Sequence, residues 1–265
     1  MAKASLNLPI GFSTADFSVY SMRGVDKLVV RAKHGPTKEQ IATEPQYAPL
    51  RRYQSEFRGV GKAISLIMAS CYAVNHLADY NFSGTLTRIC KIIQMKDELH
   101  SQGQRSILFS KYGEILNGFN LNRKNQFDSI VNKAPEYTIS RSEFKVTLKI
   151  PSLTPGINFF NPWNLPVYRF IAVLGIIPDM ILTDTGYAAA NPLMKFYVEQ
   201  SRTVWIPAGT TFNGTQLEIQ LPGDTVLDES GTLVLSLGIE FGTVVSNSLI
   251  QAVKHMGCAK VLVVV

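Results

Sequence analysis

The 265-residue sequence contains little charge, since Asp, Glu, Lys and Arg make up 17% of its residues and about 25% is usual for a soluble domain. Hydrophobic residues make up 46%. So much apolar material can offset the entropy that a chain loses on folding, so the composition excludes a disordered chain. It indicates either a large core or a surface that is partly buried against partners.

Long uninterrupted hydrophobic runs are also missing. The longest candidate, FIAVLGIIPDMIL, is broken by Pro178 and Asp179, well short of the roughly 20 residues that a membrane span needs. The opening segment MAKASLNLPIGFS lacks the apolar stretch of a secretory signal. We therefore expect no membrane span and a cytoplasmic protein, alone or within a larger assembly.

Cysteine is scarce and catalytic motifs are absent. Cys71, Cys90 and Cys258 are odd in number and have no CxxC spacing, which predicts reduced, mostly buried thiols. The four histidines lie far apart, without the spacing of metal ligands. The sequence also has no phosphate-binding glycine loop and no GxSxG nucleophile motif. We therefore expect no enzyme activity, no cofactor and no metal.

Charge is unevenly distributed along the chain. Residues 1–135 hold 18 basic and 10 acidic residues, a net charge of +8, whereas residues 136–265 hold 8 and 10, a net charge of −2. A basic first half favours an acidic partner such as nucleic acid. It equally favours an assembly in which the basic half of one subunit packs against the acidic half of the next.

The stretch FSVYSMRGVDKLVVRAKHGP, residues 17–36, predicts two short strands joined by a tight turn at Gly24. The return strand carries cations on its odd-numbered face. Such a strand can bind phosphates, can protect a sheet edge from aggregation, or can serve as an assembly arm. The residues that we expect to act in assembly are Phe17, Val19, Tyr20, Lys27, Val29, Arg31 and Lys33.

Helical periodicity dominates residues 37–134. Thr37 and Gln40 form a capping box that predicts one helical turn before Pro45. A long helix is expected from Pro49, with an apolar stripe formed by Leu50, Tyr53, Phe57, Val60, Ile64, Ile67 and Cys71. Gly59 and Gly61 within it suggest a close helix crossing. Two further helices are predicted, at Ser83–Met95 and at Arg105–Leu116.

Strand patterns separated by Pro, Gly and Asn turns fill residues 135–265. Six or more such segments, rich in aromatic and β-branched residues, predict an antiparallel β-sandwich, Ig-like or jelly-roll-like. The last segment, AKVLVVV, shows no polar alternation, so we expect it to be buried on both faces. It would then be either a central strand or a strand covered by another subunit.

The segment INFFNPWN groups Phe159, Phe160 and Trp163. Clustered aromatic rings of this kind can form a stacking platform for a base or a sugar. A loop that folds onto the end of a sandwich has the same composition, and we favour that structural role.

An ordered pattern spans residues 17–63: an aromatic strand, a Gly turn, a Val-Arg-x-Lys strand, and an Arg…Glu-Phe…Lys-Ala helix. Its positions are Phe17, Tyr20, Gly24, Val30, Arg31, Lys33, Gly35, Pro36, Pro45, Arg52, Glu56, Phe57, Lys62 and Ala63. The pattern resembles an uncharacterised protein family that is frequent in Bacteroidetes. The resemblance implies a bacterial, non-secreted product, linked to mobile elements or to a cell-specific assembly. It brings no known activity and no site residues.

Together these patterns predict an α+β fold: an N-terminal arm and hairpin in residues 1–36, a helical region in 37–134, and a β-sandwich in 135–265. The leading hypothesis is a structural, self-assembling subunit of a sheath, tube, filament or shell, built by strand addition between copies. The alternatives are a nucleic-acid-binding or packaging protein that uses the basic half, and a carbohydrate- or peptide-binding sandwich that uses the aromatic loop.

Overall fold

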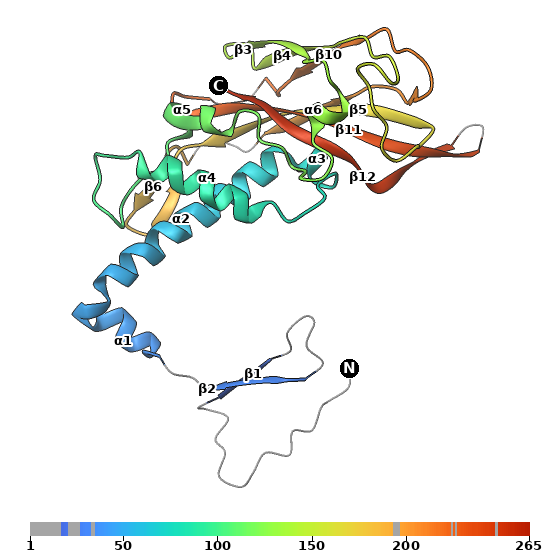
Figure 1. The fold of residues 1–265 in the computed structure, drawn as a ribbon. Helices are drawn as coiled ribbons and strands as arrows, with labels where there is room; N and C mark the ends of the chain where they lie inside the picture. The colour runs from blue at the N-terminus through green and yellow to red at the C-terminus, as the bar shows by residue number, and fades with distance from the viewer. Residues whose placement is uncertain are drawn as a thin grey trace. The chain divides into compact units, whose positions relative to one another are not determined.

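The computed structural model describes residues 17–20, 27–32, 35–192, 197–223, 225, 227–246 and 249–265. The chain divides into two units, Met1–Arg51 and Arg52–Val265. Helices and antiparallel sheets occur together, with a hairpin near the N-terminus, so the α+β class and the sandwich-like sheets are confirmed (Figure 1).

The N-terminal unit consists of a hairpin and a short capped helix. Strands β1 (Phe17–Tyr20) and β2 (Val29–Ala32) pair antiparallel. Helix α1 (Lys38–Thr43) starts at the predicted capping box, in which the Gln40 N–H donates to Thr37 Oγ1 (3.1 Å) and the Thr37 N–H donates to Gln40 Oε1 (2.8 Å). The 3-10 helix η1 (Pro45–Tyr47) follows. Gly24 and Lys33 lie outside the described residues.

Helix α2 (Ala48–Ser70) is the predicted long helix, and α4 (Ser83–Met95) has the predicted bounds. The shorter elements are α3 (Tyr72–Asn75), α5 (Phe109–Tyr112), η2 (Gly113–Leu116) and α6 (Phe127–Ile130). The helix predicted to begin at Arg105 is wrong in its first turn. Ile107 instead exchanges backbone hydrogen bonds of 2.8 and 2.9 Å with Met180, the first residue of β6 (Met180–Thr183). Its N–H and C=O groups are therefore bonded to a strand and not within a helix. In the described part of the chain, no helix is both long and apolar enough to cross a membrane.

Among the described residues of the second unit, ten strands form three sheets, all with antiparallel pairing. Their bounds are β3 (Glu136–Ser140), β4 (Lys145–Ile150), β5 (Val167–Pro178), β6 (Met180–Thr183), β7 (Gly186–Ala189), β8 (Val198–Arg202), β9 (Ile206–Pro207), β10 (Thr215–Gln220), β11 (Gly231–Ser246) and β12 (Leu249–Val264). The main sheet has the order β12-β11-β5-β8, with β9 beside one end of β5. A second sheet has the order β10-β4-β3, and β6 pairs with β7.

The main sheet is the middle layer of three. Alternate side chains of a strand point to opposite faces. Phe170, Ala172 and Leu174 of β5 pack against the β10-β4-β3 sheet, while Ile171 and Val173 pack against the helices. Figure 1 shows α3 and α4 on one side of this sheet and the smaller sheet on the other. Burial of both faces explains why β5 and β11 are almost continuously apolar.

The hydrophobic core crosses residue 135, where helices give way to strands. One cluster of buried residues contains Leu86 and Ile93 of α4 together with Val173 of β5 and Val261 of β12. The helical residues and the sandwich residues therefore share this core, and residues 52–265 form one unit.

The terminal segment AKVLVVV forms the end of β12, the last strand of the main sheet. Its outer edge is covered by residues 117–122 of the same chain. The N–H groups of Gly118 and Leu121 donate to Val261 O and Ala259 O at 2.9 Å, and the Val261 N–H donates to Phe119 O. The predicted central position is therefore wrong, because the strand ends the sheet and its own chain covers this part of its outer edge. Cover by another subunit stays a prediction.

Candidate functional site

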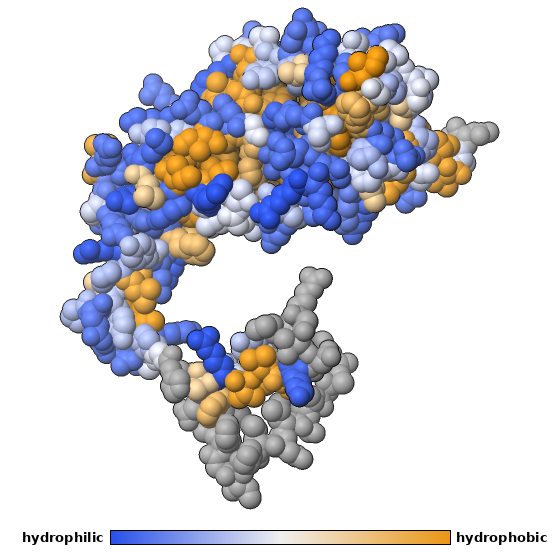
Figure 2. Space-filling model, in the orientation of Figure 1, coloured by the Kyte–Doolittle hydropathy of each residue, from blue (hydrophilic) through white to orange (hydrophobic). Residues whose placement is uncertain are grey.

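The N-terminal unit has no core of its own. None of its described residues is buried, and the apolar side chains of Val19, Tyr20, Leu28 and Val30 are exposed. Figure 2 shows apolar surface on the hairpin. An isolated two-stranded hairpin is marginally stable at best in water. Packing of these exposed apolar side chains against another surface would therefore stabilise the hairpin.

The structure brings most of the predicted assembly residues together across the hairpin. Tyr20 lies opposite Val29, and Val19 lies opposite Val30. Phe17 and Val29 are partly buried, whereas the remaining described members, Val19, Tyr20, Lys27 and Arg31, are exposed. Lys33 lies outside the described residues.

The apolar stripe of α2 is only half covered. Val60 and Ile67 are buried as expected, but Tyr53 and Phe57 are 56% and 65% exposed, and Leu50 is exposed as well. Sequence periodicity assigns all of these residues to a core. The stripe thus continues beyond the core that it was expected to face, and its first turns form an apolar surface that the sequence reasoning missed.

This surface of α2 is basic. Arg52 and Arg58 are exposed near the two aromatic rings, and Glu56, the single acidic residue of α2, is buried. Arg51 is already engaged, since it donates to Ile41 O (2.6 Å) and Glu44 O (2.9 Å). An acidic partner surface would complement it better than a second α2 helix would, because two basic helices repel each other.

The two glycines of α2 have different environments. A Cβ atom on Gly59 would lie 2.7 Å from the Tyr187 ring, so this glycine permits close contact between α2 and β7. A Cβ on Gly61 would meet nothing within 4 Å. The predicted close approach therefore exists at Gly59 alone, and it involves a strand and not another helix.

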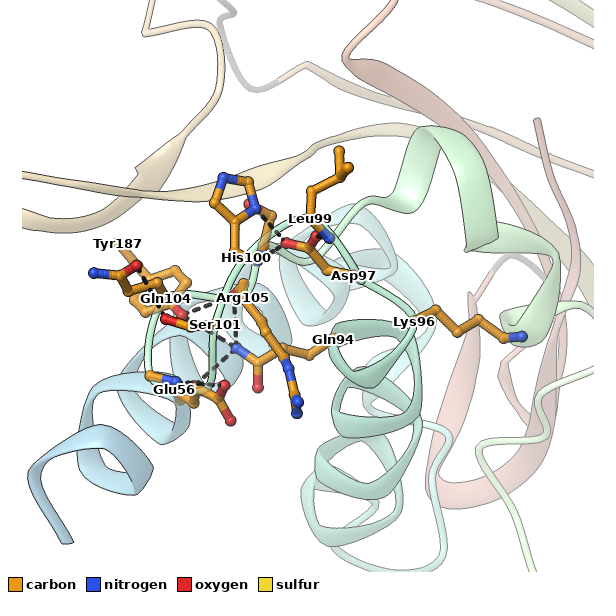
Figure 3. A network of polar contacts seen from close by, with 12 residues as sticks. Glu56, Gln94, Lys96, Asp97, Leu99, His100, Ser101, Gln104, Arg105 and Tyr187 are labelled. Atoms are coloured by element: carbon orange, nitrogen blue, oxygen red, sulfur yellow. Dashed lines mark hydrogen bonds and ion pairs between the residues drawn. The ribbon is translucent and has the colours of Figure 1, made fainter. Parts of the chain in front are cut away.

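A network of polar contacts connects α2, α4 and β7 to the loop that follows α4 (Figure 3). Buried Glu56 accepts the Gly103 N–H at 2.9 Å and pairs with the Lys91 ammonium group. Gln94 donates to Arg105 O at 3.1 Å, and the Tyr187 hydroxyl donates to the same oxygen at 2.7 Å. The side chains on regular elements therefore fix the backbone of this loop.

Asp97 holds the other end of this loop. Its carboxylate accepts hydrogen bonds from His100 Nδ1 (2.8 Å) and from the N–H groups of Ser106 (2.7 Å) and Leu99 (3.0 Å). Burial alone would raise the pKa of Asp97, but these hydrogen bonds lower it below its usual value. An ionised Asp97 makes His100 Nδ1 the proton-bearing nitrogen and leaves Nε2 free to interact.

A cavity of about 380 Å³ adjoins His100, with both polar residues (Gln104, Ser106 and Asp184) and apolar residues (Ile181 and Leu182) in its lining. It could hold a small polar molecule. In this fully described region, however, no hydrogen bond joins His100 Nε2 to a serine hydroxyl, so the cavity lacks the paired nucleophile and base of covalent catalysis. No group of three potential metal ligands occurs among the described residues. The printed contacts of the network thus join the loop to α2, α4 and β7.

The cysteines lack the chemistry of a reactive thiol. All three are free and buried, as predicted. Burial raises the pKa of Cys90 to about 12, and it also raises the pKa values of Cys71 and Cys258. Thiols held in the protonated form are poor nucleophiles.

A buried charge centre on the main sheet escaped the sequence reasoning. Glu240 of β11 pairs with Arg169 of β5 and with His76 Nε2 at 3.3 Å. The Arg169 guanidinium lies over the Trp205 ring, 4.4 Å from its centroid. Burial would raise the pKa of Glu240, but the hydrogen bonds from His76 and Arg169 lower it. No sequence motif links these residues, because strand register alone brings Glu240 opposite Arg169.

The aromatic loop packs inward. Phe159 is buried and its ring contacts Tyr168 (centroids 4.4 Å apart) and Phe241 (6.2 Å). Trp163 packs edge-on against Phe241 at 5.0 Å and is partly buried, and Phe160 alone of the three is exposed. Core residues thus pack against the rings of Phe159 and Trp163.

Exposed apolar side chains also gather at the end of the β11–β12 ribbon. Val244, Val245 and Leu249 are exposed there, and Figure 2 shows this apolar end on the second unit.

In comparisons with known proteins, no family model, no curated protein and no solved structure matches the chain. The resemblance to a Bacteroidetes family therefore stays a prediction, and function has to be inferred from the surfaces described above.

Proposed function

We propose that the protein is a structural subunit that assembles with copies of itself through its N-terminal unit. The observation that carries this proposal is the absence of any buried residue among the described residues of this unit, although it folds as a hairpin and a capped helix. Ordering these residues costs conformational entropy, and apolar contacts with a neighbouring subunit would offset that cost.

The charge distribution favours a head-to-tail contact. The basic residues concentrate in the first half of the sequence and a net negative charge lies in the second. A contact between two different surfaces of the same chain produces rings or open filaments. Such an assembly would belong in the cytoplasm, since three free thiols suit a reducing compartment.

A pair of charged substitutions tests this proposal. Val19→Asp with Val30→Asp places two carboxylates opposite each other on the hairpin. The matched control, Ser142→Asp with Thr185→Asp, adds the same charge at exposed turn residues of the second unit. The wild-type chain and the control should form regular particles in negative-stain electron microscopy, and the hairpin variant should remain monomeric. Particles of unchanged form in all three proteins would contradict the proposal.

Nucleic-acid binding is the second candidate, and the exposed rings of Tyr53 and Phe57 beside Arg52 and Arg58 favour it. Exposed rings can stack on bases while cations contact phosphates. Binding of a single-stranded oligonucleotide should then weaken steeply between about 50 and 200 mM salt. Phe57→Ala should weaken it further, while Lys149→Gln, which removes an exposed cation on β4, should not. Binding that is weak and unaffected by Phe57→Ala would exclude this candidate.

A further inference from the structure

Strand β8 is an open edge of the main sheet. In the described part of the chain it pairs with β5 and with no other strand, from Val198 opposite Gly175 to Arg202 opposite Ile171. An open edge presents unpaired N–H and C=O groups to which a further strand can bind.

The backbone groups that face this edge can be assigned. The Ile176 N–H donates to Tyr197 O (3.3 Å), and the Thr203 N–H donates to Phe170 O (3.1 Å). In an antiparallel pair, hydrogen-bonded and non-hydrogen-bonded residues alternate. Residues 199 and 201 therefore bond to β5, whereas Val198, Gln200 and Arg202 direct their N–H and C=O groups away from it.

The opposite edge of the sheet is closed within the chain along the last residues of β12. Residues 117–122 cover the end of β12, and side chains complete the cover: Asn117 Oδ1 accepts the Val264 N–H (2.8 Å) and Asn122 Oδ1 accepts the Ala259 N–H (3.0 Å). Among the described residues, no such cover lies on the outer side of β8, which pairs with β5 alone.

The surroundings of β8 offer apolar contacts and the carboxylate of Glu199, for which no ion pair with another described residue occurs. Tyr72, which receives a hydrogen bond from Gln200 (3.5 Å), is exposed, and Val204 just beyond the strand is 82% exposed. Glu199 is exposed.

We propose that the β8 edge accepts strand β2 of the N-terminal hairpin of a second copy, an inference that rests on the proposed self-assembly. The two strands match in length, four residues in β2 and five in β8. Arg31 of β2 supplies the cation that Glu199 lacks, while β1 has no charged residue. Main-chain hydrogen bonds would provide affinity and side chains would select the register.

The edge strand β3 is a poorer acceptor. The β10-β4-β3 sheet has one face in solvent, as the alternating exposure of β10 shows. A hairpin added there would bury apolar residues on one face alone. At β8, the added hairpin lies in line with the helical layer on one face of the sheet and with the smaller sheet on the other, so more of its apolar surface could be buried.

A proline at position 200 tests the edge directly. Because the Gln200 N–H points away from β5, proline can replace it without removing a hydrogen bond within the sheet. The control Gln200→Ala removes the same side chain and keeps the N–H. We expect Gln200→Ala to assemble like the wild-type chain and Gln200→Pro to stay monomeric with an unchanged circular dichroism spectrum. Normal assembly of a folded Gln200→Pro protein would overturn the inference.

Cross-linking provides a readout that does not depend on the proline variant. A copy carrying Val30→Cys is mixed with a copy carrying Gln200→Cys and treated with a short bis-maleimide, for which the native, buried thiols give little background. A dimer that needs both substitutions supports the contact. If the wild-type chain assembles and this mixture yields no dimer, the acceptor is not β8 and the proposed function stands. A wild-type chain that is monomeric at every concentration overturns both.

Discussion

Glu56 illustrates how this protein tolerates charge in its interior. The side chain is fully buried, yet one carboxylate oxygen accepts the Gly103 N–H and the other pairs with Lys91. A buried carboxylate without such partners would cost several kcal/mol. The three other buried carboxylates of the described chain, Asp97, Asp179 and Glu240, are likewise hydrogen-bonded. In this chain with few charges, each buried carboxylate therefore joins parts of the fold through its hydrogen bonds and ion pairs.

We predict that Glu56→Ala lowers the free energy of unfolding by about 3 kcal/mol, because it leaves Lys91 without its partner and the buried Gly103 N–H unsatisfied. The matched control is Glu218→Ala, which breaks the exposed Lys145–Glu218 pair and should change stability far less. Urea unfolding followed by circular dichroism measures both. Equal losses in the two variants would contradict the structural role of the buried pair.

The lowered pKa of Glu240 makes stability depend on pH. A carboxyl whose pKa is lower in the folded state stabilises the fold above its unfolded pKa, about 4.3 for Glu, and loses that contribution as the pH falls through the folded value. At pH 7 the wild-type chain should therefore exceed Glu240→Gln in unfolding free energy by about 2 kcal/mol. Urea titrations at decreasing pH should show this gap closing below about pH 4. A gap that is constant with pH would show that the ion pair with Arg169 does not cause it.

Helix α2 combines two environments within one element. Its second half packs into the core, and its first half exposes Tyr53 and Phe57. The apolar periodicity is the same in both halves, so the sequence predicts the helix correctly but cannot tell which part of the stripe has a partner within the chain. Whether a part of the stripe is buried depends on which other elements extend over it, and the local sequence pattern does not encode this.

The two glycines of α2 give a matched pair of substitutions. Gly59→Ala should destabilise the protein by about 1–3 kcal/mol, because the new methyl group would overlap the Tyr187 ring. Gly61→Ala should stabilise it by about 0.5–1 kcal/mol, since space is open there and alanine favours the helix. Thermal unfolding of both variants checks the prediction, and a stabilising effect at position 59 would show that α2 and β7 are not in close contact.

The closure of the β12 edge depends on Asn122. Its amide donates to Leu77 O (2.8 Å) and Gly257 O (3.2 Å), and its oxygen accepts the Ala259 N–H. Asn122→Ala should cost about 2–3 kcal/mol, because these buried backbone groups lose their partner. It should also increase aggregation on gentle heating, since the sheet edge becomes accessible. Asn120→Ala, which removes a less buried amide of the same segment, serves as the control, and equal behaviour of the two variants would contradict the prediction.

At the scale of the whole molecule, the α+β class, the hairpin, the capping box and most strands follow from periodicity and turn chemistry. The end of β12 shows the limit of such reasoning. Its apolar sequence predicts burial on both faces, and Ala259, Val261 and Val264 are buried whereas Val265 is exposed. The covering segment, residues 117–122, carries no strand pattern and pairs through isolated backbone bonds. The Glu240 centre was likewise beyond prediction, because it depends on the register between β5 and β11. Long-range pairing determines both features.

The claim most open to direct test is that residues before α1 mediate assembly. The measurement is the molar mass, by light scattering at matched concentrations, of the full chain and of a chain that begins at residue 36. The described residues removed by this truncation include none that is buried, so the melting temperature should be unchanged. The account predicts a large, regular particle for the full chain and a monomer for the shortened one. A full chain that remains monomeric at high concentration, or a shortened chain that forms the same particle, would contradict it.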